Sequence, residues 1–254
     1  MANNLFILFA HARSGSTVLN KILNTHPEIK SISEPFNHDR HQWDDKTYYS
    51  RIHDIPSFDT VLDEIASAYN GMNHHFSQLD FEYNKHLLLN RASRVIFLWR
   101  KNLLQAVISR SIAEQTKVWH AAKTSSSSSP AVPQTLDPLD LKRVKRRLEK
   151  LEKGIRSYRD LLKESGKDFF EICYEDFLNP RLEFLDKLKQ LDPIFTYLGN
   201  SPISTNTTKI AAIESILNPT HRKLNSEASY RRIPNIDEVE AQLGCEATGY
   251  LFNR

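Results

Sequence analysis

The sequence is poor in cysteine and has no long apolar segment. Cys173 and Cys245 are the only cysteines. Two are too few for a disulfide framework or a cysteine-ligated zinc site, which fits a reducing compartment. No apolar run approaches the roughly 18 residues that a membrane-spanning helix needs. No basic-then-apolar leader precedes the first predicted strand. We therefore expect a cytoplasmic protein.

Two kinds of ligand-binding motif are also missing. The triphosphate-binding loop G-x-x-x-x-G-K-[ST] requires Gly-Lys followed by Ser or Thr, and the chain contains no such tripeptide. This absence argues against a nucleotide-dependent small-molecule kinase, an alternative that saturable binding of ATP would revive. The histidines of residues 38–41 and 74–75 have neither cysteine partners nor a helical His-Glu pattern, so we expect no metal site.

Length and composition suit one large α/β domain over residues 1–254. Apolar residues make up 40% of the chain and charged residues 26%, which are ordinary values for a globular protein. One segment near residues 123–135 is rich in serine and has no apolar pattern. We expect this segment to be a flexible linker within the domain.

A strand, a glycine turn and a helix open the chain. Residues 5–10 are apolar and rich in aromatic and branched side chains, which predicts a strand buried on both faces. Residues 18–23 place apolar side chains at helical spacing, and the helix must end before Pro27. Between them lie one cation, one glycine and three hydroxyls, namely Arg13, Gly15, Ser14, Ser16 and Thr17. Backbone N–H groups and the positive end of a helix meet at such a turn, so we expect it to bind phosphate or sulfate.

The remaining pattern predicts alternating strands and helices. Gly71 is expected to close a helix over residues 58–70. Further strands are predicted at residues 29–33 and 169–173. Residues 87–89 and 95–99 are also apolar runs, and they can be consecutive strands of the sheet only if one is an edge strand or an irregular link separates them. Further helices are predicted near residues 102–119, 141–163, 209–217 and 236–243. Residues 174–177 are predicted to lead into another helix that runs through Leu188 or Leu191.

A second strand-to-helix corner follows residues 95–99. Arg100 lies at the carboxyl end of this strand, and Ser109 lies on the next predicted helix. Ligands bind at this edge of α/β sheets, so the pair is a candidate anion site. Lys101 is an alternative cation, but a guanidinium offers a planar bidentate fork and makes Arg100 the preferred partner.

Positive charge is concentrated between residues 142 and 163, which contain ten basic and three acidic residues. A helical stripe of apolar residues runs through the segment, so it is predicted to be an amphipathic helix with a basic outer face. That face is either solvated or meets an anionic substrate or membrane surface. Nucleic acid is the least favoured partner, because the one aromatic residue of the segment, Tyr158, belongs to the apolar stripe and no stacking aromatic side chains interleave the charges.

The two corners resemble the cofactor sites of sulfotransferases. Residues 13–17 resemble the loop that holds the 5′-phosphosulfate of PAPS (3′-phosphoadenylyl sulfate). Arg100 and Ser109 resemble the pair that binds its 3′-phosphate. Further similarity to the bacterial carbohydrate-type branch, which is trehalose 2-sulfotransferase-like, lies in Asn102–Val107, Gln115–His120, Tyr174–Asp176 and Asn235–Val239. The resemblance implies PAPS as co-substrate. It also implies a three-layer α/β fold like that of P-loop kinases, with a parallel sheet of about five strands flanked by helices.

Sulfuryl transfer needs a base that takes the proton of the acceptor hydroxyl. Glu34 follows the second predicted strand in a Glu-Pro pair, and the resemblance implies that a glutamate here is the base. This strand would place Glu34 beside residues 13–17, called the first loop below, if the strands at residues 5–10 and 29–33 are neighbours in the sheet. His11 and His120 are the alternative bases. A catalytically silent binding protein with the same fold remains an alternative, which gains if Glu34 points away from the site.

The resemblance further implies the acceptor class. The acceptor is expected to be a small molecule or glycan with a hydroxyl group, such as a sugar, a glycolipid or another alcohol. Variable loops form acceptor pockets in this family, so the sequence names no individual acceptor. It specifies no oligomeric state either.

Overall fold

The chain forms two compact units. The computed structural model describes residues 5–37, 48–119, 135–178, 182–205, 207–217 and 227–252. The first unit comprises Met1–Trp99 and Ile155–Ile216, and the second comprises Arg100–Gly154 and Leu217–Arg254. Nearly all of the serine-rich segment lies outside the described residues, and one domain over residues 1–254 stays a prediction.

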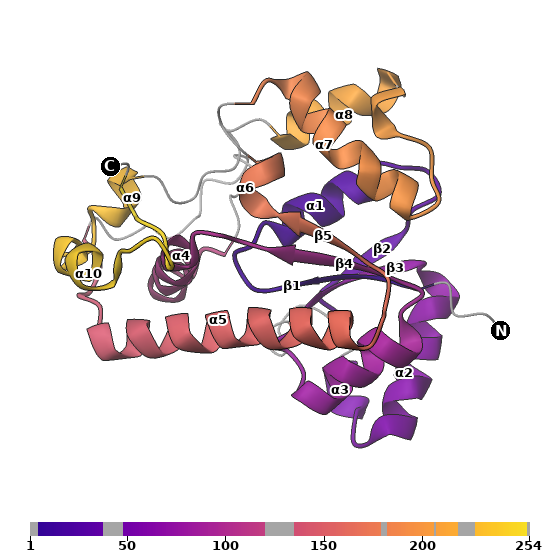
Figure 1. The fold of residues 1–254 in the computed structure, drawn as a ribbon, viewed down its shortest axis with the longest axis horizontal. Helices are drawn as coiled ribbons and strands as arrows, with labels where there is room; N and C mark the ends of the chain where they lie inside the picture. Colours follow the sequence, from indigo (N-terminus) through magenta and orange to yellow (C-terminus); the bar gives the residue numbers. More distant parts are fainter. Residues whose placement is uncertain are drawn as a thin grey trace. The chain divides into compact units, whose positions relative to one another are not determined.

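The first unit is built on a five-stranded parallel sheet (Figure 1). Its order is β2-β3-β1-β4-β5, so the N-terminal strand is central. The strands are β1 (Phe6–Ala10), β2 (Ser31–Ser33), β3 (Gly71–His75), β4 (Arg94–Trp99) and β5 (Phe169–Cys173). The predicted parallel sheet is therefore confirmed.

Helices cover both faces of this sheet, which gives the predicted three layers (Figure 1). Helices α1 and α7 lie on one face, and α2, α3 and the part of α5 from Ile155 onward lie on the other. Short 3₁₀ helices occur at Tyr49–Arg51 and Ile203–Thr205. The helices of the unit are α1 (Ser16–Leu23), α2 (Ile55–Ala68), α3 (Phe81–His86), α5 (Leu141–Glu164, shared with the second unit), α6 (Tyr174–Phe177), α7 (Phe184–Tyr197) and α8 (Thr207–Leu217).

Strand β1 is fully buried because helices pack on both of its faces. All five of its residues are buried, as the continuous apolar run predicts. The Phe9 ring meets the edge of the Tyr158 ring of α5, with centroids 4.9 Å apart. On the same helix, the Arg159 guanidinium lies 4.6 Å from the Trp99 ring centroid and pairs with Glu171 at 2.7 Å. The basic helix therefore uses its inner face to cover the sheet.

Residues 87–89 do not form a strand, so the conditional expectation of two consecutive strands at 87–89 and 95–99 is wrong. Leu87–Leu89 belongs to a π-helical turn, Leu87–Arg91, that continues α3. The third strand in the chain is β3, which contains Asn73, His74 and His75 and has all of its residues buried. A search for apolar runs does not find this strand, because three of its five residues are polar. Gly71 begins this strand and does not close the preceding helix, which ends at Ala68. A side chain would not fit here, because a Cβ at this position would lie 2.1 Å from the Phe6 ring.

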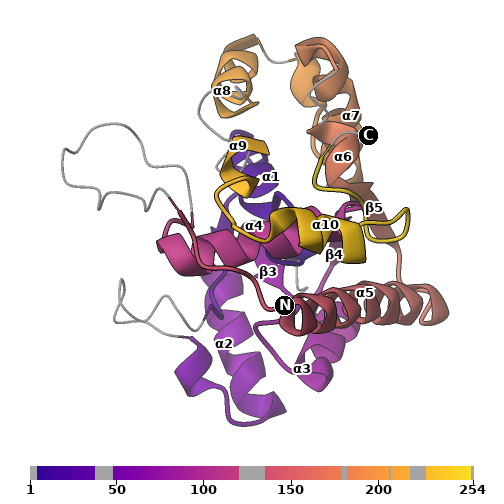
Figure 2. The ribbon, with the colours of Figure 1, turned by 90° about the vertical axis from the view of Figure 1, so that its left-hand side faces the viewer.

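The second unit is mainly helical. It contains α4 (Leu103–Thr116), the first part of α5, α9 (Glu227–Tyr230) and α10 (Ile236–Leu243). Figure 2 shows α10 and the yellow C-terminal segment beside α4. Asn235 fastens the segment before α5, because its amide accepts from Leu139 N–H and donates to Leu139 C=O, each at 2.8 Å. Within the described ranges, no helix is both long and apolar enough to cross a membrane.

We expect His74 to make stability depend on pH. Burial lowers the pKa of His74 to about 4, although a hydrogen bond to Asn84 partly opposes the shift. Unfolded His74 should titrate near its usual pKa of about 6.5, so the unfolded state binds more protons between these values. Acidification from pH 7 to 4 should therefore lower the free energy of unfolding by about 3 kcal/mol through this group. Urea titrations at several pH values measure how the free energy of unfolding changes with pH.

His74→Asn removes this titrating group and should flatten the pH dependence. His53→Gln is the matched control, because His53 is exposed. If the free energy of unfolding of His74→Asn depends on pH as strongly as that of the unmodified protein, other groups cause the acid sensitivity.

Candidate active site

The turn after β1 has a backbone that few sequences can adopt. Arg13 has φ of 68° and Gly15 has φ of 86°, both in the left-handed region. A Cβ at Gly15 would lie 2.7 Å from the Tyr174 ring, so glycine is required both for its φ and for space. Strand β1, this turn and α1 therefore form the strand-turn-helix corner that the sequence predicts.

The hydroxyls of the turn have different partners. The buried Ser14 hydroxyl donates to His11 C=O at 2.7 Å and holds the turn together. Ser16 Oγ lies 2.8 Å from His75 Nε2, which connects the first residue of α1 to the end of β3. Thr17 is half-buried on α1. The first N–H groups of a helix have no partners within the helix, so this end of α1 can bind an anion.

Glu34 is held at the carboxyl end of β2. Its side chain is buried, with 8% of the residue exposed, and its φ of 49° is also left-handed. Glu34 Oε2 accepts hydrogen bonds from Asn37 Nδ2 at 2.8 Å and from Gln78 Nε2 at 3.0 Å. His75 Nδ1 lies 3.5 Å from the same oxygen. The carboxylate therefore faces other polar groups of this sheet edge rather than solvent.

The strands that carry Glu34 and the first loop are not neighbours. Strand β3 lies between β2 and β1, so the condition under which Glu34 would lie directly beside the loop is not met. Instead, His75 of β3 contacts Ser16 through one ring nitrogen and faces Glu34 through the other. The structure thus brings Ser16 and Glu34 to opposite sides of a single imidazole.

In the second unit, Arg100 and Ser109 are both buried. The Arg100 guanidinium donates to Gln105 Oε1 at 2.6 Å, and Ser109 lies in the second turn of α4. Lys101 is exposed. The helix begins after Asn102, whose side chain accepts a hydrogen bond from Gln105 N–H at 2.9 Å and caps the helix.

The C-terminal segment fixes this corner of the second unit. Gln105 Nε2 donates to Tyr250 C=O at 3.1 Å, and Asn102 Nδ2 donates to the same carbonyl at 2.6 Å. Leu104 N–H donates to Thr248 C=O at 2.8 Å. The side chain that orients the Arg100 guanidinium is therefore itself held by backbone about 150 residues later, a separation over which ordering has a high entropic cost.

Two other groups bear on the acid–base assignment. His11 is buried and its Nδ1 lies 2.9 Å from Ala12 C=O, so this nitrogen donates to the turn. His120 lies outside the described residues. Burial and a hydrogen bond to Glu175 raise the pKa of Cys173 to about 12, so its thiol stays protonated at neutral pH. The end of β5 therefore offers no thiolate nucleophile.

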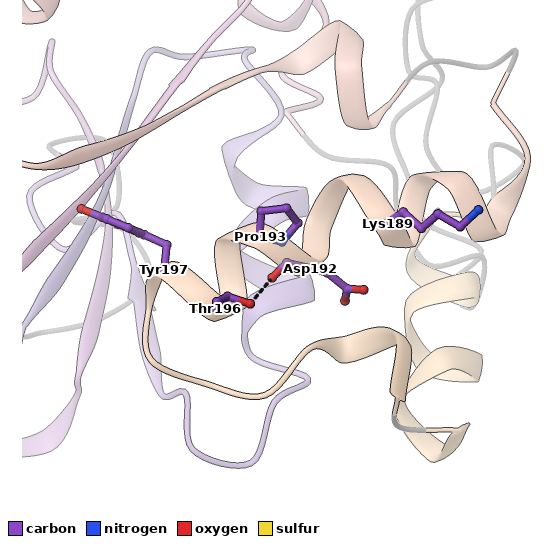
Figure 3. Close-up of a pocket in the computed structure, with 5 residues that line it drawn as sticks. All are labelled: Lys189, Asp192, Pro193, Thr196 and Tyr197. Carbon is purple, nitrogen blue, oxygen red and sulfur yellow. Dashed lines mark hydrogen bonds between the residues drawn. The ribbon is translucent and has the colours of Figure 1, made fainter.

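A hollow along α7 involves none of the predicted site residues (Figure 3). It is lined by Lys189, Asp192, Pro193, Thr196 and Tyr197. Asp192 accepts a hydrogen bond from Ser204 N–H, and Lys189 pairs with Asp186. The Tyr197 hydroxyl donates to Asp168 C=O and accepts from Val95 N–H, and burial raises its pKa. The polar groups of this hollow thus hold the fold together.

Sequence reasoning missed the residues that orient the predicted ones. His75, Gln78 and Asn37 surround Glu34, and Gln105 orients Arg100. The one available signal was the His74-His75 pair, which the sequence suggests only as a weak metal motif. Across the described part of the chain, no three His, Cys, Asp or Glu side chains are grouped as metal ligands would be.

Comparison with known proteins identifies the family. The sequence model of the family described as Stf0 sulphotransferase matches residues 77–212, which is more than half of the chain. This segment includes Arg100 and Ser109 and begins after the first loop, Glu34 and His75. No curated protein matches the chain. Among solved structures, the mouse sulfotransferase SULT7A1 complexed with PAP is similar over 97% of this chain and 77% of its own, with 14% identity and a TM-score of 0.48. On the evidence of the family match, the chain belongs to the Stf0 sulphotransferase family.

Proposed function

We propose that this chain transfers the sulfuryl group of PAPS to a hydroxyl of a carbohydrate, a glycolipid or another alcohol. The hydroxyl oxygen attacks sulfur and forms a new S–O bond. The S–O bond to the 5′-phosphate breaks and PAP leaves, while the hydroxyl proton passes to Glu34. Membership in the Stf0 sulphotransferase family is the observation that carries this proposal.

The turn after β1 is proposed to hold the 5′-phosphosulfate. Its left-handed backbone at Arg13 and Gly15 and the first N–H groups of α1 provide a cradle suited to an anion. The Arg13 guanidinium would neutralise charge on the leaving phosphate oxygen. Ser14, Ser16 and Thr17 complete the proposed loop, with the Ser14 hydroxyl supporting its shape.

The corner at the start of α4 is proposed to hold the 3′-phosphate through Arg100 and Ser109. Arg100 is preferred to Lys101 as the cation that binds the 3′-phosphate, because a side chain already oriented by Gln105 loses less conformational entropy on binding a phosphate. Lys101 is exposed, whereas Arg100 is buried.

The acceptor is proposed to be a small molecule or glycan and not a nucleic acid. Most basic side chains of α5 lie on its exposed outer face. The one aromatic residue of this helix, Tyr158, is buried, so the outer face offers no ring on which bases could stack and a solvated or membrane-facing role suits it better. Action in the cytoplasm and peripheral contact with a membrane belong to this proposal.

Calorimetry with PAP and AMP tests the 3′-phosphate site. Only PAP carries the 3′-phosphate, so Arg100→Ala should weaken the binding of PAP by roughly 10–100-fold. This factor corresponds to the about 1.5–3 kcal/mol that a hydrogen bond to a charged group contributes. AMP binding should be unchanged. PAP at about 100 times its dissociation constant should also raise the free energy of unfolding by roughly 2.7 kcal/mol, seen as a higher Tm.

Lys101→Ala is the matched control and should leave both affinities unchanged. If it weakens PAP while Arg100→Ala does not, the cation is misassigned. If the unmodified protein binds ATP more tightly than PAP, the 3′-phosphate site itself is wrong and the kinase alternative is revived.

A further inference from the structure

A line of three side chains joins the first loop to the proposed base within the first unit. Ser16 Oγ and His75 Nε2 are 2.8 Å apart, and His75 Nδ1 is 3.5 Å from Glu34 Oε2. The three residues lie on α1, β3 and the end of β2, at the edge where the parallel strands β1, β2 and β3 end. Ser16, His75 and Glu34 are all buried. A buried polar contact of this kind responds strongly to movement of any of its members.

The contacts around Glu34 distinguish its two oxygens. Asn37, Gln78 and His75 all approach Oε2. Gln78 also accepts a hydrogen bond from His75 N–H at 3.2 Å, so the β3 backbone and the turn after it form one support. With Oε2 occupied by these groups, Oε1 is the oxygen that can take the acceptor proton. A fixed carboxylate is more effective than a rotating one, because the acceptor hydroxyl must meet it in one geometry.

We propose that His75 positions Glu34 relative to the phosphosulfate loop. Its Nε2 lies within hydrogen-bonding distance of the Ser16 hydroxyl, and its Nδ1 faces the Glu34 carboxylate at 3.5 Å, within ion-pairing distance. Binding of the phosphosulfate at Ser16 then fixes the imidazole, which in turn fixes the direction of Glu34 Oε1. His75 is a positioning residue, since the proton moves from the acceptor to Glu34 and His75 keeps its own protons. This inference rests on the proposed roles of Glu34 and Ser16.

Two substitutions separate the two contacts of His75. In His75→Gln the amide reaches the position of Nε2, so the Ser16 contact is kept and the Glu34 contact is lost. We expect kcat to fall on the order of 10²-fold, because a small displacement of a reacting group has this effect, while PAP affinity is unchanged. In His75→Asn the amide lies near the position of Nδ1, so the Ser16 contact is lost. KM for PAPS should rise and PAP affinity should fall.

The double variant Glu34→Gln/His75→Gln tests whether His75 acts through Glu34. If it does, kcat of the double variant equals that of Glu34→Gln alone. Multiplicative losses, or a normal kcat in His75→Gln when Glu34→Gln is impaired, would overturn the positioning role but not the base. A normal kcat in Glu34→Gln itself would instead overturn the proposed base.

Gln78→Ala keeps the proposal testable if neither His75 variant folds, since Gln78 is only half-buried. It removes a second donor to Glu34 Oε2 and the acceptor for His75 N–H. A lower kcat with unchanged PAP affinity supports the positioning of Glu34 by this group. A normal kcat in Gln78→Ala would contradict it. Thermal unfolding of each variant verifies its fold.

Discussion

Replacing Glu34 with glutamine is expected to lower turnover by about 10²–10⁴-fold, the usual contribution of a general base. Glutamine keeps the size and polarity of the side chain but cannot accept a proton at neutral pH. Its amide can still meet the donor groups of Asn37 or Gln78 through its oxygen. The fold should therefore survive. Steady-state turnover with saturating PAPS and a sulfated acceptor as readout measures the effect.

PAP affinity is the internal control for this variant. Glu34 contacts no phosphate in the proposed site, so Glu34→Gln should bind PAP as the unmodified protein does. Glu28→Gln is the matched substitution, because Glu28 is exposed just before β2 and should have normal turnover. Loss of PAP binding in Glu34→Gln would indicate a defect of the fold or cofactor site. Near-normal turnover would remove Glu34 as the base and leave His120 and then His11 as candidates.

Arg13→Ala is expected to reduce turnover by about 10²–10³-fold, as does the loss of one preorganised group that stabilises developing charge. The leaving 5′-phosphate gains negative charge as its bond to sulfur breaks, and the Arg13 guanidinium is proposed to neutralise it. Arg13→Lys should recover part of the turnover, because lysine restores the charge but lacks the bidentate fork. Turnover at saturating PAPS separates this effect from weaker binding.

Lys21→Ala removes an exposed cation of the adjacent helix α1 and should have little effect. A normal turnover in Arg13→Ala would show that the turn after β1 is structural and does not hold the reacting group. A Lys21→Ala variant as impaired as Arg13→Ala would instead indicate a general effect of positive charge near the site.

The first corner could be predicted from sequence because its determinants are local. An apolar run, one glycine and a helical repeat lie within residues 5–23 and specify strand, turn and helix. Strand β3 was missed because its burial depends on partners elsewhere. His74 and His75 each have one ring nitrogen in contact with a distant side chain, Asn84 and Ser16 respectively, and this allows polar residues to occupy buried positions. The apolar run Leu87–Leu89 is compatible with a strand but forms a π-helical turn, because short apolar runs suit both strands and helices.

The site shows the same division between local and long-range information. Arg13 and Gly15 follow from neighbouring residues, whereas the strand order that puts β3 between Glu34 and the loop does not. His75 gains its place from that order alone. Likewise, the sequence predicts that Arg100 ends a strand and that Ser109 lies on the following helix. It does not predict the contact between Gln105 and Tyr250, which joins distant parts of the chain. Contacts at such separations have no pattern in a single sequence.

Detection of a sulfated product tests the central claim most directly. The full chain is incubated with PAPS and a panel of sugars, glycolipids and simple alcohols, and products are analysed by mass spectrometry, with PAP release measured in parallel. Arg13→Ala serves as the matched control. The proposed function predicts an acceptor whose mass gains one SO₃ group, with equal release of PAP, and strong reduction of both in Arg13→Ala. PAPS consumption no faster than in that variant, with no sulfated product across the panel, would contradict it.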